Sequence, residues 1–457
     1  MKIIVVGCGK VGYTLTEQLS AEGHDITIIE SNDAKMESAC TNLDVIGVSG
    51  NGTSYRVQQE AGVEDADMLI AVTNRDEINL LACLIAKKAG NCQTVARVRN
   101  PEYFKEIGFL KEELGLTMVI NPERAAAAEI ARLIQIPSAM EIDTFAKGRI
   151  SLMKLELPKE SPWVGMQISE VSSKFGGNLL ICVIERRSPE GKCEILIPGG
   201  NTYLQAGDKI SVIVSPEQSN MLFQRAGVAH RIIKNVMIAG GSTISYYLAE
   251  ELLKSRIKVK IIDIKQSRCE ELSELLPGAM ILEGDAANET LLNEEGIANT
   301  DAFVALTNFD EENIMLSLYA NKVSKAKLFT KVNRIAFEGV ISEIPIGSVI
   351  SPKNLTAEYI IRYVRSMQNS MGSNVEAVYR MMHNQVEALE FYIKEDSKVT
   401  NISLANLKLK PNLLICGIVR DGKKIIPTGQ DELRKGDSVI VVTTNIGLND
   451  IQEIMRS

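Results

Sequence analysis

The chain of 457 residues contains one segment that occurs twice. The apolar run, the glycine-rich turn and the acidic residue of Lys2–Glu30 return in the same order in Asn235–Asp263. Farther along, Asp67–Asn74 returns as Asp301–Asn308, and the offset between matching positions stays at 233 or 234 residues. A constant spacing across several separate motifs indicates a duplicated unit. A fold proposed for the first half therefore has to hold for the second half as well.

The first unit begins with a strand, a turn, a helix and a second strand. Residues Lys2–Val6 form an apolar run that suits a strand buried on both faces, followed directly by the turn Gly7-Cys8-Gly9-Lys10-Val11-Gly12. Leu15 and Leu19 then recur at helical spacing, and a second apolar run ends on Glu30. This is the order that a dinucleotide-binding unit requires.

Each glycine of the turn has a separate physical role. Gly7 allows the chain to leave the strand sharply, Gly9 lets the backbone approach a pyrophosphate, and Gly12 lets the helix lie close to the sheet. The free N–H groups and the dipole at the helix start favour phosphate charge. Glu30 can accept both hydroxyls of an adenosine ribose, and its charge disfavours the 2′-phosphate of NADP. We expect an adenine nucleotide here; the alternative is a Rossmann-like fold with an empty turn.

Strands and helical stretches alternate through each half. In the first half the expected strands lie near residues 2–6, 25–29, 45–48, 67–72, 94–98 and 117–120. This alternation predicts a doubly wound parallel sheet with a ligand crevice at the carboxyl ends of its strands. Thr73 and Asn74 follow the fourth strand, where they would either face that crevice or cap the helix beginning near Asp76. Arg97 lies near the carboxyl end of the fifth strand.

A single helix and a smaller β-rich module follow each sheet. The helices open at Asn121-Pro122 and Ser351-Pro352, with Pro in the first turn. The module near residues 148–225 contains apolar runs and a Gly-Asp turn, and the same pattern returns near the end of the chain. Because Gly and Asp both tolerate tight turns, we interpret that dipeptide as local turn chemistry without a catalytic role.

The expected fold class is therefore α/β, with two Rossmann-like doubly wound parallel sheets that are each followed by a small β-rich α+β lobe. We expect four domains, at residues 1–135, 141–225, 232–366 and 374–457. No apolar run approaches the ~18–20 residues of a membrane span, and Met1 leads directly into a core strand. We expect a soluble chain without a signal peptide.

Composition argues against several functions. The 50 basic and 58 acidic residues give a net charge of −8, so no basic excess is present to neutralise nucleic acid. The eight cysteines form no CxxC pair and histidines number only three, which favours reduced buried cysteines over a metal site or disulfides. Cys8 is the exception, because a thiolate would be favoured at a helix start; a redox role for it stays a hypothesis.

The chain offers no recognisable catalytic set. A dehydrogenase needs a proton-handling residue opposite the nicotinamide. None of His24, His230 and His383 neighbours a crevice in sequence, and His24 is expected to be a solvated turn residue. GxSxG, HExxH and Walker motifs are absent from the sequence. We therefore expect a sensor with no catalytic residues.

The whole chain resembles the TrkA family, the cytosolic regulatory subunits of bacterial and archaeal Trk potassium uptake systems. That family repeats a nucleotide-binding RCK N-lobe, also called the KTN domain, and a small C-lobe twice. The resemblance rests on Gly7–Gly12 with Glu30, Gly50-Asn51-Gly52, Asp67–Asn74 and Ala96–Arg99. It implies a homotetrameric ring that binds NAD(H), with ATP and ADP as alternative or additional ligands. The ring would dock on a TrkH-type potassium-translocating protein at the inner face of the cell membrane and gate potassium flux.

The resemblance also implies the binding residues. In the first half they are Gly7, Cys8, Gly9, Lys10, Val11, Gly12, Glu30, Asn51, Thr73, Asn74 and Arg97, the last as a partner for a phosphate. In the second half they are Ala239, Gly240, Gly241, Ser242, Thr243, Asp263, Asp285 and Thr307.

The second half departs from the family pattern in its turn. Ser242 replaces the middle glycine and Ser245 the last one. The side chain of Ser242 would crowd a pyrophosphate unless Gly241 takes over that approach. At the following loop the second half fits the family better, because Asp285 offers a carboxylate where Asn51 offers an amide. Two other functions stay open: an NAD-dependent oxidoreductase, and a nucleotide sensor for another cation transporter.

Overall fold

A computed structural model describes residues 1–90, 92–145, 150–174, 179–187, 193–214, 219–228, 232–333, 341, 344–370, 375–381 and 385–456. The chain forms two compact units. Unit 1 comprises Met1–Ala131 with Ile233–Ile361, and unit 2 comprises Arg132–Ile232 with Arg362–Ser457. Both larger α/β lobes thus belong to unit 1 and both β-rich lobes to unit 2. The four separate domain ranges stay a prediction.

The first N-lobe contains a six-stranded parallel sheet in the order β3-β2-β1-β4-β5-β6. Its strands are β1 Lys2–Val6, β2 Asp25–Glu30, β3 Ile46–Ser49, β4 Met68–Ala71, β5 Gln93–Arg97 and β6 Met118–Ile120. Four of the five residues of β1 are buried, because this central strand has helices over both faces. The chain order reverses between β1 and β4, which places the expected crevice there.

Helices follow the strands of the first N-lobe in alternation. They are α1 Lys10–Ala21, α2 Asp33–Asn42, α3 Tyr55–Glu60, α4 Asp76–Ala89, α5 Pro101–Lys105, α6 Ile107–Glu113 and α7 Pro122–Gln135. Val11, Leu15 and Leu19 form the buried stripe of α1, at the spacing expected from the sequence. This stripe holds the start of α1 against the sheet.

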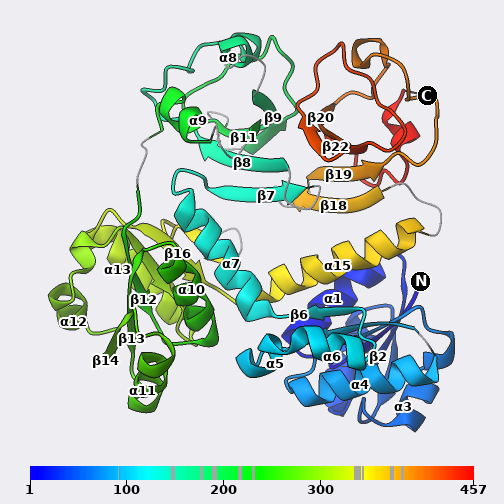
Figure 1. Ribbon diagram of the computed structural model, residues 1–457, viewed down its shortest axis with the longest axis vertical. Coiled ribbons are helices and arrows are strands. Elements are labelled where there is room, and N and C mark those ends of the chain that lie inside the picture. The colour runs from blue at the N-terminus through cyan, green and yellow to red at the C-terminus, as the bar shows by residue number, and fades with distance from the viewer. Residues whose placement is uncertain are drawn as a thin grey trace. The chain divides into compact units, whose positions relative to one another are not determined.

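The second N-lobe repeats the same topology, in the order β14-β13-β12-β15-β16-β17. Its strands are β12 Asn235–Ala239, β13 Lys258–Asp263, β14 Met280–Glu283, β15 Ala302–Ala305, β16 Lys327–Lys331 and β17 Ser348–Ile350. Its helices are α10 Thr243–Lys254, α11 Gln266–Leu275, α12 Glu289–Glu294, α13 Asp310–Val323 and α15 Pro352–Ser370. Figure 1 shows α12 and α13 on one side of this sheet and α10 and α11 on the other. The doubly wound α/β prediction is confirmed for both halves.

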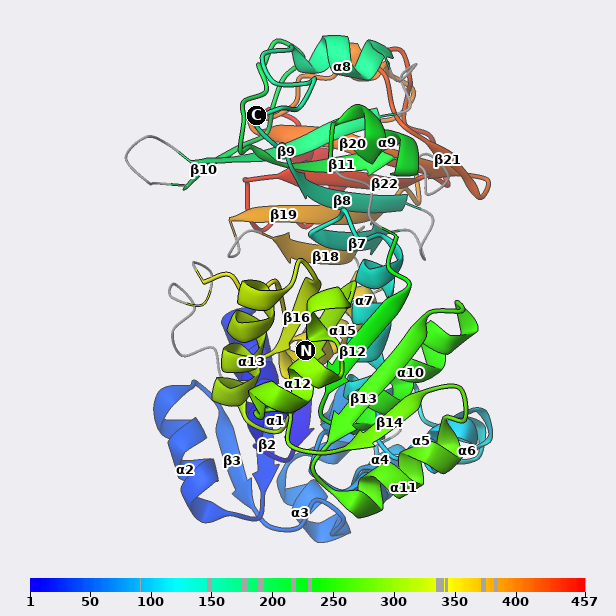
Figure 2. The same cartoon turned by 90° about the vertical axis from the view of Figure 1, so that its left-hand side faces the viewer.

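Unit 2 contains two five-stranded antiparallel sheets. The first has β7 Glu141–Phe145, β8 Ile150–Glu156, β9 Leu179–Arg187, β10 Cys193–Leu196 and β11 Lys209–Val214. The second has β18 Val375–Met381, β19 Val386–Tyr392, β20 Leu413–Arg420, β21 Lys423–Ile425 and β22 Ser438–Thr443. Helices α8 Ile168–Lys174 and α9 Ser219–Arg225 accompany the first sheet. The two sheets share one apolar core, which includes Phe145 and Ile213 from the first and Val386 and Ile440 from the second (Figure 2).

The Gly-Asp turns of the C-lobes do more than reverse the chain. Asp208 is 1% exposed and accepts two hydrogen bonds from Arg186, at 2.8 and 2.7 Å. Asp437 is fully buried and accepts the same pair from Arg420, at 2.8 and 2.7 Å. A bidentate pair of this kind fixes the turn to the neighbouring strand. The interpretation of this dipeptide as turn chemistry alone was therefore incomplete.

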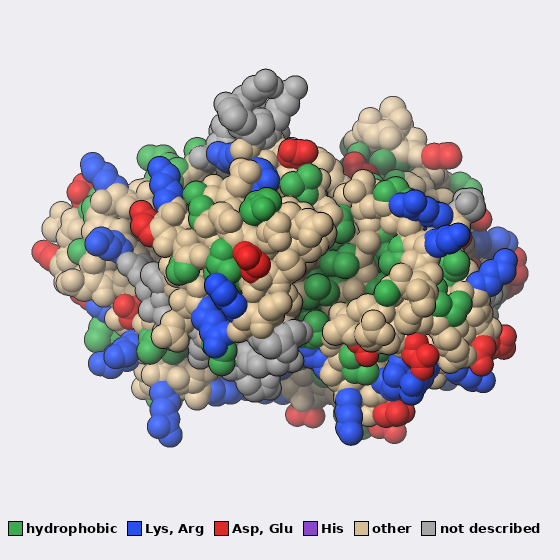
Figure 3. Space-filling view, turned by 90° about the horizontal axis from the view of Figure 1, so that it is seen from above, with side chains coloured by type: hydrophobic (Ala, Val, Ile, Leu, Met, Phe, Trp, Pro, Cys, Tyr) green, Lys and Arg blue, Asp and Glu red, His purple; other side chains and the backbone are tan. Residues whose placement is uncertain are grey.

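Charged side chains of both signs lie together on the surface. On the face seen in Figure 3, Lys and Arg side chains are interspersed with Asp and Glu. Within the described ranges, no helix combines the length and apolar character that crossing a membrane requires.

Candidate nucleotide-binding sites

The turn Gly7–Gly12, called the first turn below, leaves β1 and enters α1. Gly7 has φ +95°, and a Cβ there would lie 3.0 Å from the Cα of Thr73, which follows β4. A Cβ at Gly12 would lie 1.9 Å from the carbonyl oxygen of Gly7, so the helix approaches the turn too closely for any side chain. Gly9 is the N-cap residue of α1, and a Cβ on it would meet nothing within 4 Å. The helix start is thus uncapped by any side chain and faces open space.

Glu30 lies at the tip of β2, as the sequence predicts, and its carboxylate faces the first turn. Its Oε2 accepts a hydrogen bond from the backbone N–H of Cys8 at 2.7 Å, and its Oε1 accepts one from Asn32 at 3.0 Å. The loop that follows β3 lies beside it, because Gly50 donates its N–H to the Glu30 carbonyl oxygen at 3.0 Å. A carboxylate fixed in this way keeps lone pairs available for a ribose diol.

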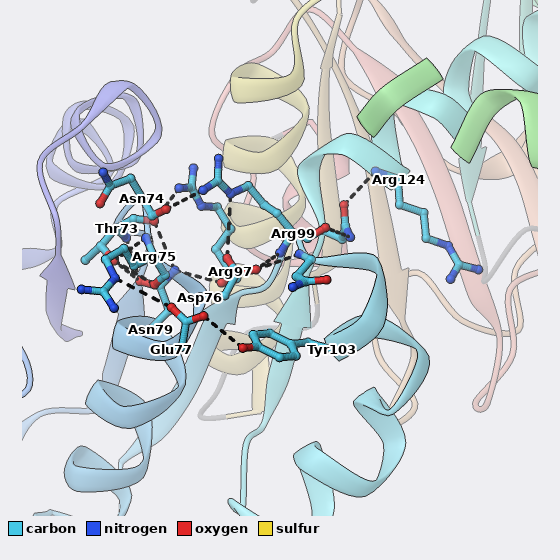
Figure 4. A network of polar contacts seen from close by, with 12 residues as sticks. Thr73, Asn74, Arg75, Asp76, Glu77, Asn79, Arg97, Arg99, Tyr103 and Arg124 are labelled. Atoms are coloured by element: carbon cyan, nitrogen blue, oxygen red, sulfur yellow. Dashed lines mark hydrogen bonds and ion pairs between the residues drawn. The ribbon is translucent and has the colours of Figure 1, made fainter. Parts of the chain in front are cut away.

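Thr73 and Asn74 lie between β4 and α4, in the polar network of Figure 4. The buried side chain of Asn79 accepts from the N–H of Thr73 at 2.8 Å and from its hydroxyl at 2.7 Å. Its amide donates to the carbonyl oxygen of Arg97 at 2.9 Å, which ties the ends of β4 and β5 together. The N-cap residue of α4 is Arg75, without a side-chain bond. The capping interpretation for Thr73 and Asn74 is therefore wrong, and the Asn74 side chain is exposed.

Two arginines lie beside this loop. Arg97 donates to the carbonyl oxygen of Thr73 and Arg99 to that of Asn74. Asp76 accepts from the N–H of Arg99 at 2.8 Å, and its carboxylate lies 3.8 Å from the Arg99 Nε. Burial, and then the charge of Arg99, lower the pKa of Arg97. Two guanidinium groups so close together at the carboxyl edge of a sheet create a positive potential there.

Several buried polar atoms of this cluster make no hydrogen bond. Among the residues that the structure describes, the Nε atoms of Arg97 and Arg99 and the Oε2 of Glu123 are buried without a hydrogen bond. Burial raises the pKa of Glu123, which opens α7. Buried polar atoms without a hydrogen bond are rare in folded proteins, so this cluster is an unusual feature of the sheet edge.

The loop residues after the third strands serve as turns in both halves. Asn51 accepts hydrogen bonds from the N–H and the hydroxyl of Thr53, at 3.0 and 2.9 Å. Asp285 accepts from the N–H of Ala287 at 2.8 Å. The amide of Asn51 and the carboxylate of Asp285 therefore both stabilise a turn by accepting a hydrogen bond from the residue two positions farther on.

The second half repeats the frame of the first. Gly240, with φ +97°, follows Ala239 at the end of β12, and Thr243 opens α10. Asp263 accepts from the N–H of Gly241 at 2.6 Å, as Glu30 does from Cys8. Thr307 is held by Asn313 through a 2.8 Å bond to its N–H. Ser242, however, caps α10 with its own side chain.

Two expectations about titratable residues are wrong. Burial and the neighbouring Glu30 carboxylate raise the pKa of the Cys8 thiol, so its place at a helix start does not favour a thiolate. His24 is only 5% exposed, and its Nδ1 lies 3.5 Å from the N-terminal amine, so it is not solvated. His230 and His383 lie outside the described residues. Within the described part of the chain, no cluster of His, Cys, Asp and Glu could hold a metal ion.

The expected residues of the first half thus converge on one edge of the sheet. The first turn, Glu30, the loop at Asn51, Thr73 and Arg97 all lie at the carboxyl ends of β1 to β5. Sequence reasoning did not assign a role to Asn79, Asp76 or Glu123. Asn79 could have been found, because an asparagine recurs at residue 313 with the same offset.

The comparisons with known proteins cover most of the chain. The TrkA-N domain matches residues 3–122 and 236–352, and the TrkA-C domain matches residues 152–227 and 388–456. The Trk system potassium uptake protein TrkA homolog of Archaeoglobus fulgidus is 32% identical over 456 residues, which is 100% of both chains. This chain belongs to the TrkA family.

Other relatives agree with that assignment. The Trk system potassium uptake protein TrkA of Halomonas elongata is 32% identical, over 100% of this chain and 99% of the relative. Among solved structures, the GsuK channel bound to NAD has a TM-score of 0.63 and 18% identity, covering 97% of this chain and 77% of that one. The crystal structure of the GsuK RCK domain has a TM-score of 0.62 and 19% identity, covering 97% and 92%. The TrkA-family chain therefore has the fold of a tandem RCK protein.

Proposed function

We propose that this chain is a nucleotide-sensing regulatory subunit of a Trk-type potassium uptake system, and not an oxidoreductase. Potassium uptake is the function named for its full-length relatives in Archaeoglobus fulgidus and Halomonas elongata. The observation that supports nucleotide binding most strongly is the first turn, where the start of α1 has no side-chain cap and Gly9 faces open space. Free N–H groups at a helix start attract phosphate oxygens.

The groups around the first turn fit the parts of an adenine dinucleotide. The phosphates would lie against Gly7–Val11, and the adenosine ribose against Glu30. Arg97 and Arg99 add positive charge beside the loop at Thr73 and Asn74, which suits phosphate oxygens. Asn51, Thr73 and Asn74 border the same edge. NAD(H) fits this arrangement, as do ATP and ADP, and NAD is the ligand of the GsuK channel with the same fold.

The proposed assembly is a homotetrameric ring on the inner face of the cell membrane, docked on a TrkH-type potassium-translocating protein. Nucleotide binding would shift the ring between two conformations. A ligand can bias the membrane pore only by its difference in affinity for the two states of the ring. The mixed charges on the surface seen in Figure 3 and the net charge of −8 argue against nucleic acid as a partner.

Calorimetric titration of the full chain with NADH, NAD⁺, ATP and ADP tests the site. Gly9→Asp and Glu30→Ala should each weaken binding at least 100-fold, because the first adds a charge among the phosphates and the second removes the ribose acceptor. Glu37→Gln, on the exposed side of α2, is the control and should bind like the wild type. NADPH should bind more weakly than NADH. Unchanged affinity in both site variants, with their unfolding temperatures preserved, would contradict the assignment.

Reconstitution tests the partner. A TrkH-type membrane protein in vesicles should change its potassium flux when the chain and nucleotide are both added, and the Gly9→Asp chain should lose that response. Co-purification with another cation transporter, with no effect on a TrkH-type protein, would favour the alternative partner.

A further inference from the structure

We propose that the second N-lobe is closed to nucleotides, and that Ser242, Arg268 and Glu312 are the residues that close it. The inference rests on the proposed function, because it concerns which of the two lobes binds the ligand. The relevant segment, called the second turn, is Gly240–Ser245. Each chain would then hold one nucleotide, although it carries two N-lobes of the same topology.

The second turn caps its own helix. The hydroxyl of Ser242 accepts a hydrogen bond from the backbone N–H of Ser245 at 3.3 Å, so a donor that would face a phosphate already has a partner. The hydroxyl of Ser245 lies 3.0 Å from that of Ser242 and donates to the carbonyl oxygen of Gly240 at 2.5 Å. At the matching positions, Gly9 leaves the helix start uncapped and Gly12 leaves no room for a side chain. The two turns therefore differ in backbone spacing as well as in side chains.

Gly241 does not replace the missing middle glycine. A Cβ on Gly241 would lie 2.8 Å from Leu272 and 3.1 Å from Asp263, so its open side is filled by protein. Its carbonyl oxygen accepts a 2.6 Å hydrogen bond from Nε of Arg268 on α11. Arg268 also pairs with Glu271 at 2.7 Å. This guanidinium is therefore bound within the lobe and holds the backbone of the second turn against α11.

The charge around the second turn is also unfavourable. Glu312 places a carboxylate 3.3 Å from the hydroxyl of Thr307, where the first N-lobe has Ile78. Phe309 and Asn333 occupy the positions of Arg75 and Arg99. Relative to the first N-lobe, the second has lost these two positive charges and gained a negative one at this edge, while Lys331 keeps the positive charge of Arg97. A phosphate there would meet a weaker positive potential than in the first N-lobe, with a carboxylate beside it.

Binding stoichiometry of the full-length chain tests this inference. Equilibrium dialysis with NADH and, separately, with ADP should give one ligand per chain for the wild type and none for Gly9→Asp. Two ligands per chain in the wild type, or one remaining in Gly9→Asp, would overturn the inference. No binding by the wild type would instead contradict the proposed function, so the two failures are distinguishable.

A second variant tests the named residues. In the Gly9→Asp background, Ser242→Gly, Ser245→Gly, Arg268→Lys and Glu312→Ile together give the second N-lobe the residues of the first at these four positions. This variant should regain at least a tenfold affinity over Gly9→Asp alone. Failure to regain binding, with the unfolding temperature preserved, would overturn the assignment to these residues. The wild-type stoichiometry decides the main inference even if the multiple variant does not fold.

Discussion

The two glycine-rich turns of this chain share a frame and differ in what faces the ligand. In both, a buried asparagine holds the loop after the fourth strand, and a carboxylate at the end of the second strand binds the turn. The first turn leaves its helix start open at Gly9, whereas the second caps its helix with Ser242. The duplicated lobes have thus kept the contacts that hold the fold and changed the residues at the place where a phosphate would lie.

The largest expected effect concerns the shared frame. Asn79→Ala and Asn313→Ala should each lower the free energy of unfolding by about 2–3 kcal/mol, because each leaves buried backbone groups without partners. Chemical denaturation of the two variants should give similar losses. Nucleotide affinity, however, should fall only in Asn79→Ala, which loosens Thr73. A large loss of affinity in Asn313→Ala would show that the second N-lobe takes part in binding.

A smaller effect is a pH dependence of stability that arises in the second N-lobe alone. Burial lowers the pKa of Lys327, at the start of β16, to about 7, whereas the first N-lobe has Gln93 at the matching place. Above that pH the unfolded chain binds a proton that the folded chain has released, so stability should rise with pH up to the ordinary lysine pKa. The gain should be about 1 kcal/mol per pH unit. Below pH 7, Lys327 is protonated in both the folded and the unfolded chain, so this residue no longer makes the stability depend on pH.

Denaturation at pH 7 and pH 9 checks this effect. The wild type should gain stability over this range relative to Lys327→Gln, which gives the second N-lobe the residue of the first. Equal pH slopes in the two proteins would rule out a lowered lysine pKa as the cause.

The smallest effect should have opposite signs for folding and binding. Gly9→Ser gives the first turn the cap of the second, so it should raise the free energy of unfolding by a few tenths of a kcal/mol. The same hydroxyl would accept a hydrogen bond from a backbone N–H that the phosphate needs, and it would fill part of the open space. The affinity for the nucleotide should therefore fall about tenfold. The reverse change, Ser242→Gly, should slightly destabilise the chain. A Gly9→Ser variant with wild-type affinity would mean that the open helix start is not the phosphate site.

Much of this comparison follows from local sequence. The run Lys2–Val6, the glycines of the first turn and Glu30 predicted the strand, the turn and the acid in their observed places, because each signal lies within a few residues. The duplication then extended the prediction to the second half. Ser242 could be recognised from the sequence as a departure, because it stands where the motif has its middle glycine.

Other features depend on contacts between distant residues. Cys8 was expected to favour a thiolate, but the carboxylate of Glu30, 22 residues away, and burial act in the opposite direction. Asp208 was assigned only a turn role, because its partner Arg186 lies on another strand. The bond from Arg268 to the second turn crosses 27 residues and has no local signal. Sequence patterns predict helices, strands and turns well. They do not predict the side-chain contacts between distant residues that form a site.

Amide hydrogen exchange with saturating NADH tests the central claim most directly, because it reports on both turns in one experiment. Exchange should slow in peptides covering residues 7–12 and 30–32 and stay unchanged in those covering residues 240–245. Equal slowing in both turns would contradict the difference between the lobes, and no slowing in the first turn would contradict nucleotide binding itself.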